Sequence, residues 1–84
     1  MKRQKLLQKL FAGSKNIRFN ELTNIVESLG FELVRINGSH HIYQHPDIPE
    51  MVNLQDVGGK AVAYQIRQVL KLIERHDLRL EDED

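Results

Sequence analysis

Three of the four histidines in this 84-residue chain lie within residues 40–45, at His40, His41 and His45. Histidine both takes and gives a proton near neutral pH, so it is the usual general base. RNA carries a built-in nucleophile, its 2′-hydroxyl, and a base that removes that proton beside a cationic group can cleave the strand without a metal or a cofactor. The cluster therefore indicates phosphoryl transfer within RNA to a 2′,3′-cyclic product, with no metal and no small-molecule cofactor.

Three other interpretations of these residues remain open. Ser39 and His40 could form a nucleophile and base, although the side chains of neighbours on an extended chain diverge. His41, Tyr43 and His45 share one face of a strand and could bind a metal, but two histidines without a carboxylate or cysteine at ligand spacing are a poor ligand set. The same three side chains could instead be polar residues on the solvent face of a half-open sheet.

Basic residues near the end of the chain are candidates for binding RNA phosphates. Arg67, Lys71 and Arg75 follow one another at four-residue spacing, which makes a basic stripe opposite the apolar face of a helix. The solvent-facing side of any amphipathic helix carries such residues by default, so the stripe has an ordinary interpretation as well. Lys60, just before this helix, is a further cation that could gather RNA.

The formal net charge of zero conceals an asymmetry along the chain. Residues 1–18 contain six basic residues and no acid, whereas residues 19–84 hold the other six basic residues and all twelve acids. We divide the chain into a basic, helical N-terminal extension (1–18), a main domain (19–80) and an acidic tail (81–84). A charge division of this kind is typical of a nucleic-acid-binding arm, and also of a solvated helix with a frayed tail.

Length and composition narrow the class of protein. A chain of 9.8 kDa forms one small domain and excludes a large enzyme fold. With no cysteine it has neither disulfides nor a thiolate zinc site, so the apolar core must stabilise the fold alone. No apolar run approaches the roughly 18 residues of a membrane span. We expect a cytoplasmic protein with no membrane partner.

The N-terminal half predicts two helices followed by a strand. Apolar residues at helical spacing indicate a helix over residues 3–12, in the basic extension. Asn20 is a favourable N-cap for a second helix, which should end at Gly30. From Phe31 the pattern changes to strand formers, and the strand 31–36 ends at Asn37-Gly38, a strong hairpin signal.

The C-terminal half predicts two more strands and a helix. The second strand covers residues 40–45, two prolines make residues 46–49 a loop, and the third strand covers residues 51–54. A turn at Gly58-Gly59 precedes the last helix. The expected fold is α+β, with a three-stranded antiparallel sheet covered by helices on one face. Strand alternation then puts His40 with Ile42 toward the helices and His41 on the open face.

Several of these residues, at their observed spacing, resemble the HicA toxin family of bacterial toxin–antitoxin systems. The resemblance covers about residues 20–75 and lies in Leu29-Gly30-Phe31, Arg35, Gly38-Ser39-His40-His41-Ile42-Tyr43 and His45-Pro46. It implies a fold similar to the double-stranded RNA-binding domain, α-β-β-β-α, preceded here by an extra N-terminal helix. It also implies a toxin that cleaves mRNA without a metal and inhibits translation until a HicB-like antitoxin protein binds it.

The essential histidine of that family follows Gly-Ser, which by position is His40. The resemblance gives Gly38 and Ser39 the role of shaping the turn that aims it, and His41 is the second choice of catalytic residue. With the cations above, the RNA-binding candidates are Gly38, Ser39, Tyr43, Lys60, Arg67 and Lys71.

The chain departs from the family pattern in its second half. Many members have a proline and a histidine after the third strand and a glycine-threonine pair entering the last helix, where this chain has Asn53-Leu54-Gln55-Asp56 and Val62-Ala63-Tyr64-Gln65. One alternative is therefore a catalytically inactive RNA-binding or antitoxin-binding module of the same fold. Another is a protein-interaction domain that uses an open sheet edge.

Overall fold

The secondary structure changes from helix to strand and back to helix in the order expected. The computed structural model describes residues 2–13 and 16–80. Its elements are α1 (Lys2–Phe11), α2 (Phe19–Ser28), β1 (Glu32–Asn37), β2 (His40–His45), β3 (Ile48–Gln55) and α3 (Ala63–His76). The predicted α+β fold, double-stranded RNA-binding-domain-like with an extra N-terminal helix, is confirmed.

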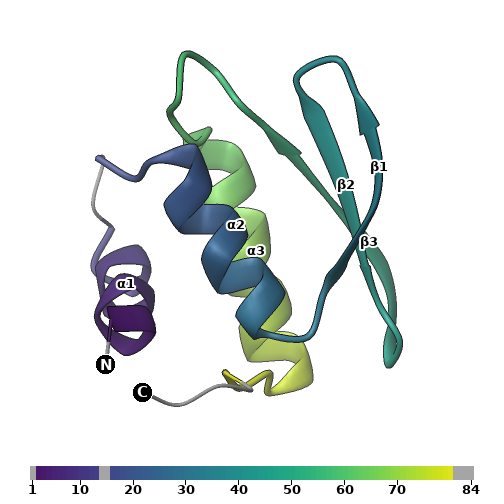
Figure 1. Ribbon diagram of the computed structural model, residues 1–84. Helices are drawn as coiled ribbons and strands as arrows, with labels where there is room; N and C mark the ends of the chain where they lie inside the picture. The colour runs from purple at the N-terminus through teal and green to yellow at the C-terminus, as the bar shows by residue number, and fades with distance from the viewer. Residues whose placement is uncertain (1, 14–15, 81–84) are drawn as a thin grey trace.

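The three strands form one antiparallel sheet in the order β1-β2-β3, so β1 and β3 are both edge strands. Helices α2 and α3 form a layer against one face of this sheet, and α1 lies on the far side of that layer (Figure 1). The other face of the sheet has no helix over it in the described part of the chain. We call this second face the open face.

The core lies between the sheet and the two helices. Leu22, Ile25 and Val26 of α2 are fully buried. Ile25 lines a small cavity with Leu6 and Leu10 of α1, so α2 buries side chains toward α1 as well as toward the sheet. Val52 and Leu54 of β3 alternate with exposed neighbours and meet the helices from the sheet side. Each such side chain contributes roughly 1.5–3 kcal/mol to stability when it is fully buried.

Helix α2 begins before the residue that the sequence favoured as its cap. Arg18, with extended backbone, is the N-cap, and its N–H donates to the Glu21 carboxylate at 2.9 Å. The backbone N–H of Phe19 donates to the carbonyl oxygen of Gly59 at 2.9 Å. Because these two bonds satisfy N–H groups ahead of Asn20, the helix extends back past it, and the prediction of Asn20 as N-cap is wrong.

The third strand is longer than predicted. β3 begins at Ile48, so only Pro46 and Asp47 separate it from β2, and the predicted loop over residues 46–49 is wrong. Pro49 lies inside this strand. A proline has no N–H to donate, but β3 is an edge strand, where one side of the backbone is unpaired in any case.

Helix α1 packs on the helix layer. Leu10 is buried at 2% exposure, Leu6 and Leu7 are half-buried, and Lys9 forms an ion pair with Glu21 at 3.7 Å. The acidic tail proposed for residues 81–84 lies outside the described residues. Across residues 2–13 and 16–80, no helix combines the length and the apolar character needed to cross a membrane.

Candidate functional site

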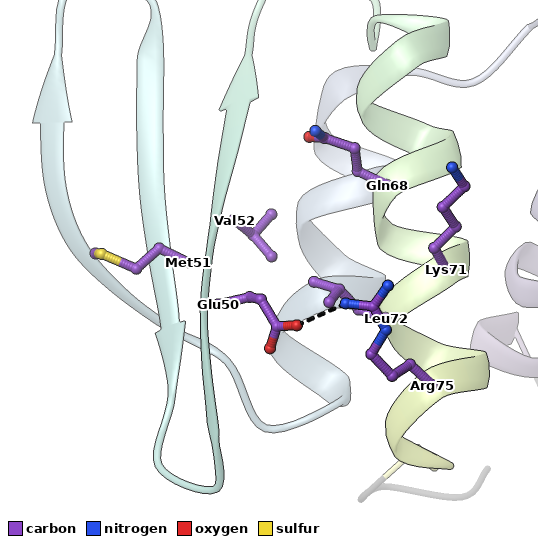
Figure 2. Close-up of a pocket in the computed structure, with 7 residues that line it drawn as sticks. All are labelled: Glu50, Met51, Val52, Gln68, Lys71, Leu72 and Arg75. Carbon is purple, nitrogen blue, oxygen red and sulfur yellow. Dashed lines mark hydrogen bonds and ion pairs between the residues drawn. The ribbon is translucent and has the colours of Figure 1, made fainter.

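Side-chain alternation divides the second and third strands between the two faces of the sheet. Tyr43 and Val52 are buried against the helices, which leaves His40 and Ile42 of β2 on the open face. Figure 2 shows the same division on β3, where Val52 points toward α3 and Met51 points away from it. The sequence predicted the opposite facing for His40 and Ile42, and that prediction is wrong.

The reason for the reversal is Tyr43. Its ring is 2% exposed and fills the core beneath the sheet, and its hydroxyl lies against Thr23 and Glu27 of α2. Burial raises the pKa of Tyr43, and the neighbouring Glu27 carboxylate raises it further. Because a buried aromatic ring stabilises the fold more than a buried Ile42 would, Tyr43 takes the helix side. Because this side chain is buried on the helix side, the structure does not place Tyr43, a predicted RNA-binding residue, on the open face with His40.

His40 is partly exposed on the open face, and one of its ring nitrogens forms a hydrogen bond. Nδ1 lies 3.0 Å from the side-chain oxygen Oδ1 of Asn53, on the neighbouring strand. An amide oxygen can only accept, so Nδ1 carries the proton and donates it. The other nitrogen, Nε2, has no hydrogen-bond partner among residues 2–13 and 16–80. This arrangement leaves Nε2 able to accept a proton from a bound molecule.

Arg35 lies on the same face, diagonally across the sheet from His40. It pairs across the strands with Ile42, the next open-face residue after His40 on β2. The register shifts between Leu33 and Arg35, so Val34 is the extra residue of a β-bulge. Arg35 lies between this bulge and the hairpin turn, where the pairing is regular, so its place opposite Ile42 follows from the turn, and the bulge changes only the pairing of Leu33 and Glu32. The regular pairing from the turn thus brings a guanidinium, which is exposed, to the face that carries the imidazole.

The turn before His40 has the geometry that its glycine permits. Gly38 has φ 63°, which fits the first central position of a two-residue type II′ hairpin turn, where glycine is favoured. The carbonyl oxygen of Ser39 accepts from the backbone N–H of Asp56 at 3.0 Å. This bond ties the turn to the loop after β3. Gly38 and Ser39 therefore fix where β2, and with it His40, begins.

Lys60 lies at the same end of the sheet as this turn. It closes a short loop in which Val57 and Lys60 exchange backbone hydrogen bonds, at 3.0 and 3.1 Å. The Asp56 carboxylate accepts from the N–H of Gly59 at 2.7 Å, which orders the loop. Since Asp56 also contacts Ser39, the structure brings the loop of Lys60 and the turn of His40 together.

His41 points to the other face of the sheet. Its ring packs edge-on against Phe19 of α2, with centroids 4.8 Å apart. Its Nδ1 is buried and has no hydrogen-bond partner in the described chain. His40 and His41 therefore face opposite sides, and His41 cannot share a substrate with His40.

Both ring nitrogens of His45 are used in holding the fold. Nε2 lies 3.1 Å from the carbonyl oxygen of Leu29, and Nδ1 accepts from the backbone N–H of Asp47 at 3.0 Å. The ring also packs edge-on against Phe31, with centroids 5.1 Å apart. With His41, Tyr43 and His45 on the helix side, the interpretation that these residues line the solvent face is wrong. No group of three or more potential metal ligands occurs among residues 2–13 and 16–80.

The basic stripe of α3 is far from His40, because α3 packs on the opposite side of the sheet. Arg67 lines a pocket against α1, together with Leu10 and Gly13. Lys71 lines a groove between α3 and β3 (Figure 2). Arg75, in the same groove, is bound to the Glu50 carboxylate at 2.9 Å. The structure brings Lys60 toward the end of the sheet that carries His40, but it does not bring Arg67 or Lys71 there.

Two residues of the open-face site were missed by reasoning from the sequence, Arg35 and Asn53. A signal for Arg35 exists: pairing counted back from the hairpin turn puts Asn37 opposite His40 and Arg35 opposite Ile42. No equivalent signal exists for Asn53. The pairing of β2 with β3 shifts between Tyr43 and His45, so the partner of each residue cannot be counted from the Pro46-Asp47 turn.

Most of the chain matches one known protein family. A family model described as HicA toxin of bacterial toxin–antitoxin matches residues 19–74, which run from the start of α2 to near the end of α3. Helix α1 precedes the matched region. No curated protein and no solved structure matches the chain. Since the match covers most of the chain, the chain belongs to the HicA family of toxins of bacterial toxin–antitoxin systems.

Proposed function

We propose that the chain is a metal-independent endoribonuclease that cleaves mRNA, with His40 as general base. The observation that carries this proposal is the state of His40: its ring lies on the open face, Nδ1 is held by Asn53, and Nε2 has no partner among the described residues. Membership of a toxin family supports an activity that harms the cell, and cleavage of mRNA in the cytoplasm inhibits translation.

The chemistry needs few groups. Nε2 of His40 takes the proton of a 2′-hydroxyl as that oxygen attacks the adjacent phosphorus. The bond from phosphorus to the 5′ oxygen breaks, a 2′,3′-cyclic phosphate remains on one fragment, and the leaving 5′ oxygen takes a proton from water. Arg35 stands on the same face and stabilises the charge that develops on the phosphate, while Lys60 binds the strand at the turn end.

The natural partner of a toxin in this family is an antitoxin, and we expect here a HicB-like protein that covers the open face. Such a protein would have to occlude His40 and Arg35 together. The antitoxin would then compete with RNA for the same surface.

The position of the other histidines favours a second candidate, a non-catalytic RNA-binding module. His41 and His45 lie on the helix side, and His76 binds the Glu50 carboxylate at 3.0 Å. His40 therefore has no second imidazole beside it to protonate the leaving oxygen. In the proposed reaction water supplies that proton, whereas the second candidate binds RNA and does not cleave it.

Cleavage of labelled mRNA in excess chelator distinguishes the two. The proteins are wild type, His40→Ala and Gln44→Ala, the last being a matched change at an exposed open-face position of the same strand. We expect wild type and Gln44→Ala to cleave at equal rates, and His40→Ala to bind RNA but to cleave about 10²–10⁴-fold more slowly. Salt-sensitive binding by wild type without cleavage would select the binding module, and the absence of binding would contradict both.

A further inference from the structure

The hydrogen-bond partner of the His40 ring comes from a different strand. The side chain of Asn53 projects from β3 on the open face, and its backbone pairs with Ile42, so it reaches His40 diagonally across the sheet. The two side chains meet at 3.0 Å between Oδ1 and Nδ1. Thirteen positions separate them in the chain, so the contact exists only because β2 and β3 pair in this register.

We propose that Asn53 is a positioning residue that holds His40 in one neutral tautomer, with the proton on Nδ1 and the lone pair on Nε2. This inference rests on the proposed function, because a tautomer matters only if Nε2 acts as the base. A neutral imidazole can carry its proton on either nitrogen, and the hydrogen bond made by one nitrogen decides the state of the other. An acceptor at Nδ1 therefore makes Nε2 the basic nitrogen.

The same contact has a second effect during the reaction. When Nε2 takes the proton, the ring becomes a cation, and the hydrogen bond from Nδ1 to Oδ1 becomes charge-assisted and stronger. The bond thus stabilises the charged state of the base more than its resting state. It also fixes the plane of the ring, so Nε2 keeps one direction relative to a bound phosphate.

An amide at position 53 affects the His40 ring differently from a carboxylate. Of the groups that share the open face with His40, β1 contributes Glu32 and Arg35 as charged residues, and β3 contributes the uncharged Pro49, Met51, Asn53 and Gln55. Asn53 orients the ring without placing a negative charge against it. A carboxylate at this position would favour the protonated ring, which is inactive as a base at neutral pH.

The fold does not depend on the Asn53 side chain. Asn53 is exposed, its neighbours Val52 and Leu54 carry the buried contacts of the strand, and its backbone pairing remains in any variant. Loss of the amide should therefore leave the urea midpoint of unfolding close to that of wild type. An effect on the reaction can then be separated from an effect on folding.

The test compares Asn53→Ala and Asn53→Asp with wild type and with Gln44→Ala as control. Heteronuclear NMR of histidine-labelled protein reports which ring nitrogen of His40 carries the proton, with the signal assigned by its loss in His40→Gln. We expect the proton on Nδ1 in wild type and Gln44→Ala, and its redistribution toward Nε2 in Asn53→Ala. RNA cleavage measured across pH gives the kinetic effect.

In the kinetic arm, Asn53→Ala should lower kcat roughly tenfold to hundredfold with KM within about twofold, since a misdirected base loses rate without losing substrate contacts. Asn53→Asp restores an acceptor, and its charge should move the acid limb of the pH–rate profile to higher pH. Gln44→Ala should match wild type in both kcat and pH profile.

Two results would overturn the inference while leaving the proposed function intact: cleavage that depends on His40 but is unchanged in rate and pH profile by Asn53→Ala, or a wild-type His40 with its proton on Nε2. If wild type cleaves no RNA, the proposed function fails. The NMR comparison of wild type with Asn53→Ala still decides whether Asn53 sets the tautomer.

Discussion

The imidazole of His45 links two segments that lie sixteen positions apart in the chain, because its Nε2 sits 3.1 Å from the carbonyl oxygen of Leu29. Leu29 is the C-cap of α2, where carbonyl groups lack partners within the helix. The other ring nitrogen accepts from the N–H of Asp47, in the turn between β2 and β3. His45 therefore fastens the end of the helix to the sheet.

His45→Ala should lower the free energy of unfolding by about 1–3 kcal/mol, because the carbonyl oxygen of Leu29 and the N–H of Asp47 lose a partner and Phe31 loses its ring contact. Urea unfolding measures the change. His40→Ala is the control, since His40 is partly exposed on the open face and should change stability by less than about 0.5 kcal/mol. Equal losses in the two variants would contradict these assignments.

Tyr43→Phe tests the assignment of Tyr43 to the core. The hydroxyl lies against Thr23 and Glu27, so its removal should cost about 1 kcal/mol of stability and leave the affinity for RNA unchanged. The pKa of Tyr43 is raised above its ordinary value of 10.0 in the folded state. Its contribution is therefore fully present below that value and is lost as pH rises through the higher folded pKa.

The corresponding measurement is urea unfolding of both proteins at several pH values on either side of 10.0. Wild type should lose more stability than Tyr43→Phe as the pH rises across this range. If the variant instead loses affinity for RNA at unchanged stability, Tyr43 is an RNA contact after all.

Glu50 should contribute an acid-sensitive part of the stability. A hydrogen bond from its own backbone lowers the pKa of Glu50, and hydrogen bonds from Arg75 and His76 of α3 lower it further. A carboxyl group with a depressed folded pKa stabilises the fold above its unfolded value of 4.5, and that stabilisation is lost as pH falls through the folded pKa.

Glu50→Gln should therefore be less stable than wild type at neutral pH and should show a shallower loss of stability on acidification below 4.5. Glu74→Gln, a change at an exposed carboxylate of α3, serves as the control and should follow the wild-type pH dependence. Parallel curves for wild type and Glu50→Gln would show that the Glu50 carboxylate makes no acid-sensitive contribution to stability.

Variants of Arg35 and Arg67 distinguish RNA binding at the open face from RNA binding at the helix layer. Arg35→Ala should weaken RNA binding and reduce the slope of log K against log salt by about 0.7, the value for one phosphate contact on a single strand. Arg67→Ala removes the same charge from the side of α3 that meets α1, and should change neither quantity. A larger loss of RNA affinity in Arg67→Ala than in Arg35→Ala would show that RNA binds at the helix layer.

The sequence was sufficient to predict the order of helices and strands, but not which residues of each strand face the helices. The Asn37-Gly38 signal located the hairpin, and the strand over residues 40–45 has the predicted bounds. Alternation showed that His40 and His41 lie on opposite faces, but it could not show which face the helices cover. That choice depends on Tyr43, whose hydroxyl finds Thr23 and Glu27 only in the folded protein.

The neighbours of His40 on the open face depend on how the strands pair, which the identity of single residues does not show. Arg35 reaches the open face through the regular pairing next to the hairpin turn, and Asn53 reaches His40 through an irregular register between β2 and β3. Arg67 and Lys71 formed a convincing stripe on their own helix. The stripe carried no information about the side of the sheet on which that helix packs.

The most direct test of the central claim uses two RNA strands of identical sequence, one unmodified and one with 2′-O-methyl groups throughout, in excess chelator. Wild type should cut the unmodified strand to leave 2′,3′-cyclic phosphate ends, which mass spectrometry identifies, and should leave the methylated strand intact; His40→Ala should cut neither. Cleavage of the methylated strand, or an undiminished rate with His40→Ala, would contradict a reaction in which His40 activates the 2′-hydroxyl.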